Sequence, residues 1–504
     1  MKTTRISFLR LMAVMLGAMA VVAAGIWFVR PTVTEAATSV PGTPTFSGYV
    51  DVTNTPSYAF QLPKVPAQEF VTLSFVVADK ANACTPSWGT YYTLDEANSS
   101  LDLERRIHQL ELTGGQARVS FGGAANDELS QACTDVRALT VAYQSVVDRY
   151  NLTSIDLDIE GAALSNQDAA GRRAQAIKAV QEQQAKAGKP LAVWLTLPVS
   201  TSGLTAEGTV AVDGMLKGGV NLTGVNGMAM DFGGSKPATQ SMSDAVIAAS
   251  SALKEQVQSS FAAVGTSLDE SQAWSKVGIT PMIGQNDVAE EQFTIADATS
   301  VNWFARQHGV GLVSMWSMNR DSTCQSPLPT VITVVQNDCS GVDQGGSLFS
   351  STLGDALKVT QPTGTASSRA QSHATSATDN PVTAPYEVWE PRAVYSAGQK
   401  VVWQGKAYEA AFYSVGSSPD APSGNGVGAP WRLLGPVLPG DKPAAPAWVP
   451  TGTYPEWNAK TAYPAGVIVQ FGNTPYESKW WTQAEEPGTS TAGSAAWRLV
   501  TPSK

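Results

Sequence analysis

Short apolar runs alternate with longer segments of helical periodicity over about residues 46–320. Runs rich in Val, Ile, Leu and aromatic residues are typical of buried strands, and intervening helices favour a parallel sheet. The predicted strands are 46–52, 71–79, 117–123, 154–160, 191–199, 222–230, 276–283 and 309–316. The predicted helices include 127–150, 166–187, 241–263 and 297–308, with Asp127 and Asp297 as expected N-caps.

The number and order of these strands predict an α/β catalytic domain built as a (β/α)8 TIM barrel. An open, doubly wound sheet is the alternative arrangement of alternating strands and helices. The first strand is not followed by a glycine-rich phosphate loop, which favours the barrel. The first strand is weakly marked, and its connection to the second lacks a clear helical pattern.

The predicted strand "SIDLDIE" carries three acidic residues on alternate positions, Asp156, Asp158 and Glu160. Successive side chains of a strand point to opposite faces, so the three carboxyl groups share one face. In a barrel the apolar face packs against the helices and the acidic face lies inside. Burying carboxylates costs several kcal/mol (about 2–7 even for neutral polar groups) unless they are hydrogen-bonded, protonated or used in chemistry. The strand therefore predicts an acidic catalytic site.

Beyond the predicted barrel the chain changes character and then repeats itself. Residues 359–385 are rich in Ser, Thr, Ala and Pro, which predicts an exposed linker. "VWEPRAVYSAGQKVVWQGKAYEAAFYS" then aligns with "EWNAKTAYPAGVIVQFGNTPYESKWWT" at constant spacing. We expect a catalytic domain over 41–358 and two small all-β modules over 386–436 and 454–502, joined by a Pro-rich spacer over 437–453.

The N-terminal 40 residues predict export. Basic residues precede a long apolar run over 11–29, and small residues follow it. A secretory signal peptide fits this pattern, and an uncleaved anchor is the alternative because the apolar run is long. Either predicts an extracellular protein. The net charge of −10 argues against nucleic acid and anionic membranes as partners.

Four cysteines suit an oxidising compartment: Cys84, Cys133, Cys324 and Cys339. They lack a metal-type CxxC pair, and three disulfide pairings are open. We favour Cys84–Cys133, because both are expected at one end of the same sheet, and Cys324–Cys339, which brackets a loop. Free thiols are the alternative. No metal or nucleotide motif is present, so we expect no cofactor.

Four short motifs resemble glycoside hydrolase family 18, the family of chitinases. "SIDLDIE" matches its DxDxE core, and "VSFGG" (119–123) resembles its SxGG motif on the preceding strand. "GMAMD" (227–231) resembles the motif on the sixth strand, and "SMW" (314–316) supplies the tryptophan at the end of the eighth. The motifs occur in the family's order, and the resemblance covers about residues 46–325.

The resemblance implies a retaining mechanism in which the substrate's own N-acetyl group is the nucleophile. Glu160 would be the general acid and base, Asp158 would orient the acetamido group, and Asp156 would tune the charge of Asp158. Ser120 would support the aspartates. The sugar site would be lined by Met228, Met230, Asp231 and Trp316.

The chain departs from the family pattern at three positions. The family signature usually has Asp-Gly where this sequence has Thr153-Ser154, and a tyrosine is common where Met230 stands. The three inner carboxyl groups are intact. We interpret the departures as traits of a subfamily that remains active.

The repeated modules resemble chitin-binding modules of carbohydrate-binding families 5 and 12. Flat aromatic side chains stack on the apolar face of a sugar ring. The resemblance assigns this role to the paired aromatic residues Trp480 and Trp481 in the second module and Phe412 and Tyr413 in the first. In an alternating strand one residue of each pair would face the interior of its module.

Together these patterns predict a secreted, endo-acting, monomeric chitinase that acts on chitin and N-acetylglucosamine oligosaccharides. Two alternatives are a catalytically inactive chitin-binding lectin and an endo-β-N-acetylglucosaminidase that acts on glycoproteins. Lectins of this kind typically lose the last acid of the motif, whereas this chain keeps Glu160. The tail modules favour an insoluble polymer over a glycoprotein.

Overall fold

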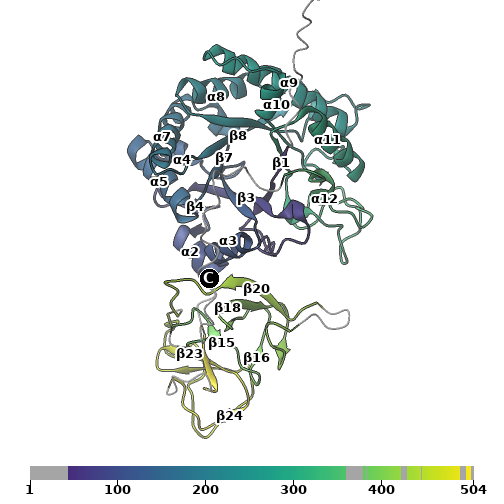
Figure 1. Ribbon diagram of the computed structural model, residues 1–504. Coiled ribbons are helices and arrows are strands. Elements are labelled where there is room, and N and C mark those ends of the chain that lie inside the picture. Colours follow the sequence, from purple (N-terminus) through teal and green to yellow (C-terminus); the bar gives the residue numbers. More distant parts are fainter. Residues whose placement is uncertain are drawn as a thin grey trace, which may run out of the picture. The chain divides into compact units, whose positions relative to one another are not determined.

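A computed structural model describes residues 44–358, 379–381, 383–421, 428–443, 445–488 and 495–500. The predicted targeting segment and most of the predicted linker lie outside these residues. The first part of the chain is a mixed α/β domain whose strands are surrounded by helices (Figure 1). The secondary structure of the last part, over its described residues, consists of short strands.

The main sheet of the α/β domain is largely parallel, in the order β1-β14-β11-β10-β8-β7-β6-β3, with β2 on β3. Its parallel strands are β1 (Thr45–Phe46), β2 (Gly48–Asp51), β3 (Phe70–Ala78), β6 (Gln116–Gly122), β7 (Ser154–Asp158), β8 (Ala192–Ser200), β10 (Leu222–Met228), β11 (Val277–Thr280) and β14 (Leu312–Val313). Three short antiparallel strands extend it: β4 (Pro86–Trp88), β5 (Tyr92–Thr93) and β9 (Gly203–Leu204).

Helices pack against the outer face of this sheet (Figure 1). They are α2 (Leu94–Leu101), α3 (Leu103–Leu112), α4 (Leu129–Ala132), α5 (Val136–Arg149), α6 (Gly161–Ser165), α7 (Gln167–Lys186), α8 (Ala206–Lys217), α9 (Met242–Ala263), α10 (Glu270–Ser275), α11 (Ile295–His308) and α12 (Phe349–Leu353). A separate hairpin is formed by β12 (Gly284–Gln285) and β13 (Gln292–Phe293).

The predicted strands lie where the apolar runs are, although the run 309–316 forms only the short β14. The predicted helix 127–150 is broken into α4 and α5, and Glu128 and Asp135 cap the two pieces, so Asp127 as N-cap was wrong. Asp297 is also not a cap. Thr294 caps α11, and Asp297 is its partner three residues later in a capping box.

Alternation along β7 decides which side chains meet the helices. Ile155, Leu157 and Ile159 belong to the large hydrophobic core with residues of α5 and α7 such as Val146 and Ile177. Asp156 and Asp158 therefore point to the opposite, inner face of the sheet.

Both favoured disulfides are present. Cys84 is bonded to Cys133, and Cys324 is bonded to Cys339. The first joins the loop before β4 to the end of α4. This confirms the predicted pairing and excludes free thiols.

The repeat found in the sequence is also a repeat of strands. The first copy contains β15 (Glu387–Val388), β16 (Val394–Tyr395), β17 (Lys400–Trp403), β18 (Lys406–Ala410), β19 (Ser414–Val415) and β20 (Trp431–Pro436). The second contains β21 (Ala462–Tyr463), β22 (Ile468–Phe471), β23 (Thr474–Ser478), β24 (Thr482–Gln483) and β25 (Trp497–Leu499). Each copy has a small aromatic core, as expected for modules of this size.

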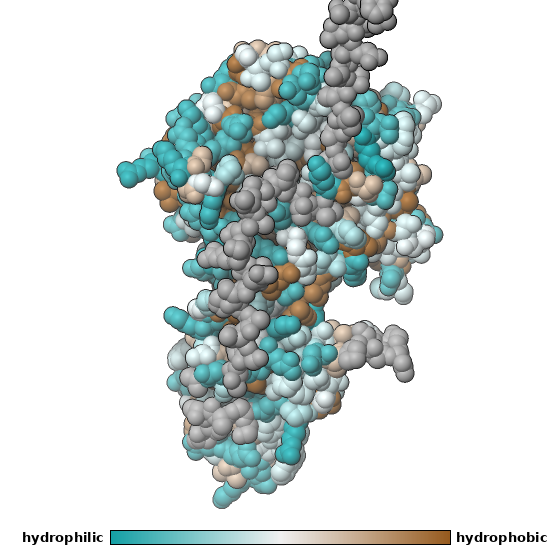
Figure 2. Space-filling model, viewed as in Figure 1, coloured by the Kyte–Doolittle hydropathy of each residue, from teal (hydrophilic) through white to brown (hydrophobic). Residues whose placement is uncertain are grey.

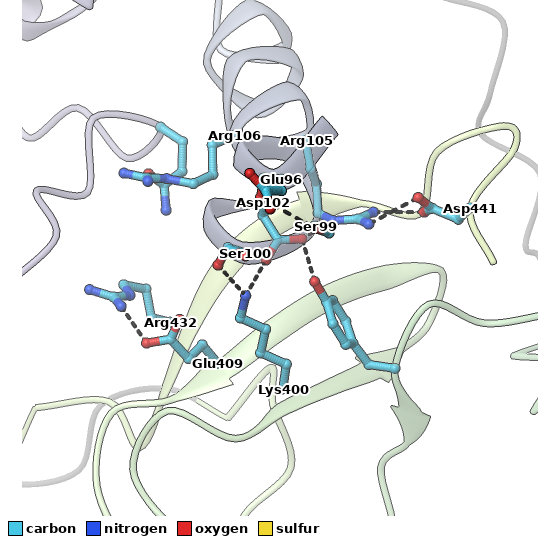
Figure 3. A network of polar contacts seen from close by, with 12 residues as sticks. Glu96, Ser99, Ser100, Asp102, Arg105, Arg106, Lys400, Glu409, Arg432 and Asp441 are labelled. Carbon is cyan, nitrogen blue, oxygen red and sulfur yellow. Dashed lines mark hydrogen bonds and ion pairs between the residues drawn. The ribbon is translucent and has the colours of Figure 1, made fainter. Parts of the chain in front are cut away.

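A buried polar network joins α3 to the first module. Asp102 is 1 % exposed and accepts hydrogen bonds from Lys400 Nζ at 2.6 Å and Tyr386 OH at 2.6 Å. Arg105 contacts Asp102 at 3.0 Å and both carboxylate oxygens of Asp441 at 2.9 and 3.1 Å (Figure 3). Burial alone would raise the pKa of Asp102, but the charges of Lys400 and Arg105 outweigh it and lower that pKa.

Among the residues that the structure describes, no helix is both long enough and apolar enough to cross a bilayer.

Replacing Asp102 by asparagine should lower the melting temperature of the full chain, because Lys400 and Arg105 then lose their shared anion in a buried setting. Removing one partner of a buried ion pair costs about 3–5 kcal/mol, whereas an exposed pair contributes about 0–1 kcal/mol. Asp355→Asn, which removes the exposed pair with Arg306, is the matched control. Calorimetry that finds equal shifts for both variants would contradict a stabilising network.

Candidate active site

Asp156 is the centre of a hydrogen-bond network on the inner face of the sheet. It is fully buried, and three hydroxyl groups donate to its carboxylate. Tyr49 on β2 and Ser120 on β6 donate to Oδ2 at 2.8 and 2.6 Å, and Thr196 on β8 donates to Oδ1 at 2.6 Å. The support expected from Ser120 is therefore present.

The network continues across the neighbouring strands. Asn226 on β10 donates to the hydroxyl of Thr196 at 3.0 Å, and Thr280 on β11 donates to the carbonyl of Asn226 at 2.9 Å. Asn226, Thr196 and Thr280 are all buried. A chain of side chains from three strands thus fixes the position of the Asp156 carboxylate.

Asp158 lies one step nearer the carboxyl end of β7 and differs from Asp156 in its surroundings. It is 4 % exposed, and its Oδ1 has no hydrogen-bond partner. Burial raises the pKa of Asp158 well above its ordinary value, and the charges of Glu160 and Asp156 add to that rise. The side chain is therefore a buried acid with an unused polar atom at the inner face.

Gly122 allows β6 to approach β7 at this point. Its φ is +105°, and a Cβ on this residue would lie 2.0 Å from the backbone oxygen of Asp158. The same oxygen accepts a hydrogen bond from the amide of Gly123 at 3.0 Å. Only glycine combines this left-handed conformation with so close a contact, which explains the first glycine of "VSFGG".

Glu160 follows β7 and is the N-cap residue of α6. It is partly exposed, unlike the two aspartates, so a molecule from solvent can reach its carboxyl group. Burial raises the pKa of Glu160 above its ordinary value. A carboxyl group with a raised pKa at the open end of a strand is suited to donate and take up a proton near neutral pH.

An aromatic cluster lies beside the carboxylates. Trp316 stacks on Phe75 with ring centroids 5.5 Å apart and 22° between the planes, and Tyr49 contacts both rings. Trp316 is only partly buried. Since Tyr49 donates to Asp156, this hydroxyl connects the aromatic cluster directly to the acidic network.

The predicted residues on the sixth strand lie at the carboxyl end of β10. Met228 and Met230 are partly exposed. Asp231 has a φ of +48° and accepts a hydrogen bond from the amide of Val288 at 3.0 Å. Its backbone is held by Glu291, a buried residue whose carboxylate accepts from the next two amides, those of Phe232 and Gly233.

The four aromatic residues predicted in the modules differ in exposure. Tyr413 and Trp481 are each 63 % exposed, and Phe412 is 38 % exposed. Trp480 instead packs against the cores of both modules, with the ammonium group of Lys479 5.0 Å from its ring centroid. The face of the molecule seen in Figure 2 mixes hydrophobic and hydrophilic residues.

Sequence reasoning missed six residues on the inner face at this site: Tyr49, Phe75, Arg118, Thr196, Asn226 and Thr280. A polar residue inside an apolar run was the available signal for Thr196 in "LAVWLTLPV" and for Arg118 in "ARVSFGG". Nothing in the pattern distinguishes Phe75 from an ordinary core residue. Within the described ranges no cluster of His, Cys, Asp and Glu has the composition of a metal site.

Comparison with known proteins gives relatives for the α/β domain. No family model matches the chain. It is 36% identical over 281 residues to a probable bifunctional chitinase/lysozyme of Escherichia coli, which covers 55% of this chain and 31% of that protein. It is 34% identical over 297 residues to endochitinase 11 of Metarhizium anisopliae, which covers 58% and 54%. The chain thus spans a third to about half of these curated relatives.

A solved structure is similar as well. The catalytic domain of a hyperthermophilic chitinase from Pyrococcus furiosus has a TM-score of 0.52 and 25% identity, covering 62% of this chain and 96% of that one. Together the likenesses support a chitinase-type glycoside hydrolase fold for the α/β domain.

Asp158→Asn should make the protein relatively more stable as the pH rises. The folded protein holds the proton of Asp158 more tightly than the unfolded chain, in which the pKa of an aspartate is about 3.9. The wild type therefore loses stability between that pH and the raised pKa of Asp158, and asparagine avoids this loss. Melting temperatures across this range measure the difference, and a constant difference would contradict a buried, protonated Asp158.

Proposed function

We propose that the chain is a chitinase that hydrolyses β-1,4-linked N-acetylglucosamine polymers with retention of the anomeric configuration. The observation that carries the proposal is the graded environment of three carboxyl groups on β7 and just beyond its end. Asp156 is held by hydroxyl donors, Asp158 is buried without a partner for Oδ1, and Glu160 is open to solvent. The likeness to chitinases supports the substrate class.

In this mechanism Glu160 protonates the glycosidic oxygen as the bond to the leaving sugar breaks. The raised pKa of its carboxyl group keeps the proton in place until it is needed. The carbonyl oxygen of the substrate's 2-acetamido group attacks the anomeric carbon and forms a cyclic oxazolinium ion. The resulting Glu160 carboxylate then takes a proton from a water molecule whose oxygen attacks the anomeric carbon. The bond between that carbon and the acetamido oxygen breaks, which restores the acetamido group.

Asp158 orients the acetamido group during this step. Its unpartnered Oδ1 is available to accept the N–H of the acetamide, which fixes the carbonyl oxygen for attack. Asp156 stays in place because three strands hold it, and its charge acts on Asp158 from below. The unpartnered Oδ1 of Asp158 destabilises the free enzyme, and the hydrogen bond from the substrate's acetamide would remove this destabilisation.

The sugar at the cleavage point would lie on the indole of Trp316, whose orientation is set by Phe75. Met228, Met230 and Asp231 would form the facing wall at the end of β10. A methionine at position 230 offers no hydroxyl, so polar contacts on this side would come from Asp231. We also propose that the sheet closes as a (β/α)8 barrel, since residues 45–51 pair with β14 at one end and β3 at the other.

The modules would deliver the enzyme to insoluble chitin outside the cell, after export directed by the N-terminal segment. Tyr413 and Trp481 supply the exposed rings that stacking on sugar requires. Trp480 would contribute by fixing the position of its neighbour, because it packs between the module cores. Once one module is bound to a repetitive surface, the linker keeps the second module near further binding sites and so raises its effective concentration there.

Glu160→Gln should abolish hydrolysis of chitin oligosaccharides, because glutamine cannot donate the proton. The loss of general acid catalysis is worth about 10²–10⁴-fold in rate. Release of reducing sugar measures it, and binding to chitin beads should survive. Glu182→Gln, an exposed change on α7, is the control that should keep full activity. An active Glu160→Gln variant would rule out the mechanism.

Trp481→Ala should weaken retention on chitin beads while leaving the hydrolysis of soluble oligosaccharides unchanged. A stacking ring contributes about 0.5–1.5 kcal/mol beyond its area, which corresponds to several-fold in affinity. Trp303→Ala removes an equally exposed indole from α11 and should not alter retention. If both variants bind like the wild type, Trp481 is not a contact to the polymer.

A further inference from the structure

A buried arginine lies on the inner face of the sheet, one layer below the acidic residues. Arg118 on β6 is 1 % exposed, and its Nε donates to the hydroxyl of Ser154 on β7 at 2.9 Å. The strand register pairs Ser120 with Asp156, so Arg118 and Ser154 occupy the layer that precedes this pair. The mechanism described above does not use Arg118.

The surroundings of Arg118 are mostly aromatic. Its guanidinium carbon lies 5.1 Å from the ring centroid of Phe70 and 5.8 Å from that of Trp194. One nitrogen, Nη2, has no hydrogen-bond partner. In the described part of the chain Arg118 forms no ion pair at contact distance. Gly224 makes room for the indole of Trp194, since a Cβ there would lie 2.4 Å from the ring.

Burying the positive charge of Arg118 in this space costs free energy, because the guanidinium group loses its hydration. Burial lowers the pKa of Arg118 to about 10, and the charge of Asp156 opposes that effect. A methionine would fill a similar volume without loss of hydration, and replacing buried charges by apolar groups is often neutral or stabilising. The benefit of the charge must therefore come from the carboxyl groups above it.

The titratable groups whose charges act on Arg118 are Asp156 from β7 and Tyr49 from β2. Asp156 and Glu160 act in turn on Asp158. The adjacent residues of β3 and β8, Phe70, Trp194 and Thr196, carry no charge. Burial raises the pKa of Asp156 above its ordinary value, and its hydroxyl donors and the charge of Arg118 offset part of that rise. Arg118 is a buried cation whose charge favours the ionised form of Asp156.

We propose that Arg118 is a positioning residue for the reaction: its buried positive charge, aimed by Ser154, keeps Asp156 ionised beneath Asp158. An ionised Asp156 is the acceptor that its hydroxyl donors require, and it favours a protonated Asp158. The inference rests on the proposed hydrolysis. It also gives a role to Ser154, which stands where the family signature differs from this chain.

The experiment compares Arg118→Met with Arg118→Lys, which keeps the charge. The pH dependence of kcat/KM is measured on a soluble chitin oligosaccharide. Without the cation, Asp156 takes up its proton at higher pH. The acidic limb of the kcat/KM profile should therefore move to higher pH by about one pH unit for Arg118→Met, which lowers kcat/KM about tenfold on the acidic side. Arg118→Lys should keep the limb near that of the wild type. An unchanged limb for Arg118→Met overturns the proposal.

A second readout does not need turnover. The attraction between Arg118 and Asp156 exists only when Asp156 is ionised, so the melting-temperature difference between wild type and Arg118→Met should grow as the pH rises. In an Asp156→Asn background this growth should vanish. Growth that persists in that background overturns the proposal. If the wild type does not hydrolyse chitin, the proposed function fails, while this comparison still tests the link between Arg118 and Asp156.

Discussion

The burial of Asp156 and Asp158 on the inner face of β7 is the constraint on which the site depends. A carboxylate removed from water needs hydrogen-bond donors, a nearby cation or a proton. Asp156 has hydroxyl donors from β2, β6 and β8, whereas Asp158 has a raised pKa and an oxygen without a partner. The neighbouring strands supply hydrogen-bond donors to Asp156 but none to Oδ1 of Asp158, so two identical side chains differ in hydrogen bonding and in pKa.

The fold keeps Asp156 and Asp158 in these two different environments. The apolar residues of β7 anchor the strand in the core beneath the helices, so its inner face cannot turn away from the site. Gly122 brings β6 against the backbone of Asp158, and the stack of Trp316 on Phe75 places an aromatic surface beside the same strand. The modules have separate aromatic cores, and Asp102 and Arg105 join the first of them to the α/β domain.

Alternation along the chain was sufficient to predict most of the strands and the shared face of Asp156 and Asp158, and the placing of the cysteines predicted both disulfides. It was insufficient where the decisive contact lies far away in the sequence. Tyr49 reaches Asp156 across 107 positions, and its phenol is indistinguishable in a strand pattern from a core aromatic. The caps of α4 and α11 were misplaced by one to a few residues, because several polar residues there can accept the same backbone amides. Alternation turns one residue of each aromatic pair inward, and Trp480 does pack against a core. It also packs against the core of the first module, which periodicity cannot predict.

The most direct test of the central claim is the anomeric configuration of the first product. Proton NMR spectra recorded during the first minutes of hydrolysis of a chitin oligosaccharide distinguish the β-anomer from the α-anomer before they equilibrate. Attack by the substrate's own acetamido group, oriented by Asp158, predicts the β-anomer as the initial product. Initial release of the α-anomer would mean direct attack by water and would contradict the roles assigned to Asp158 and Glu160.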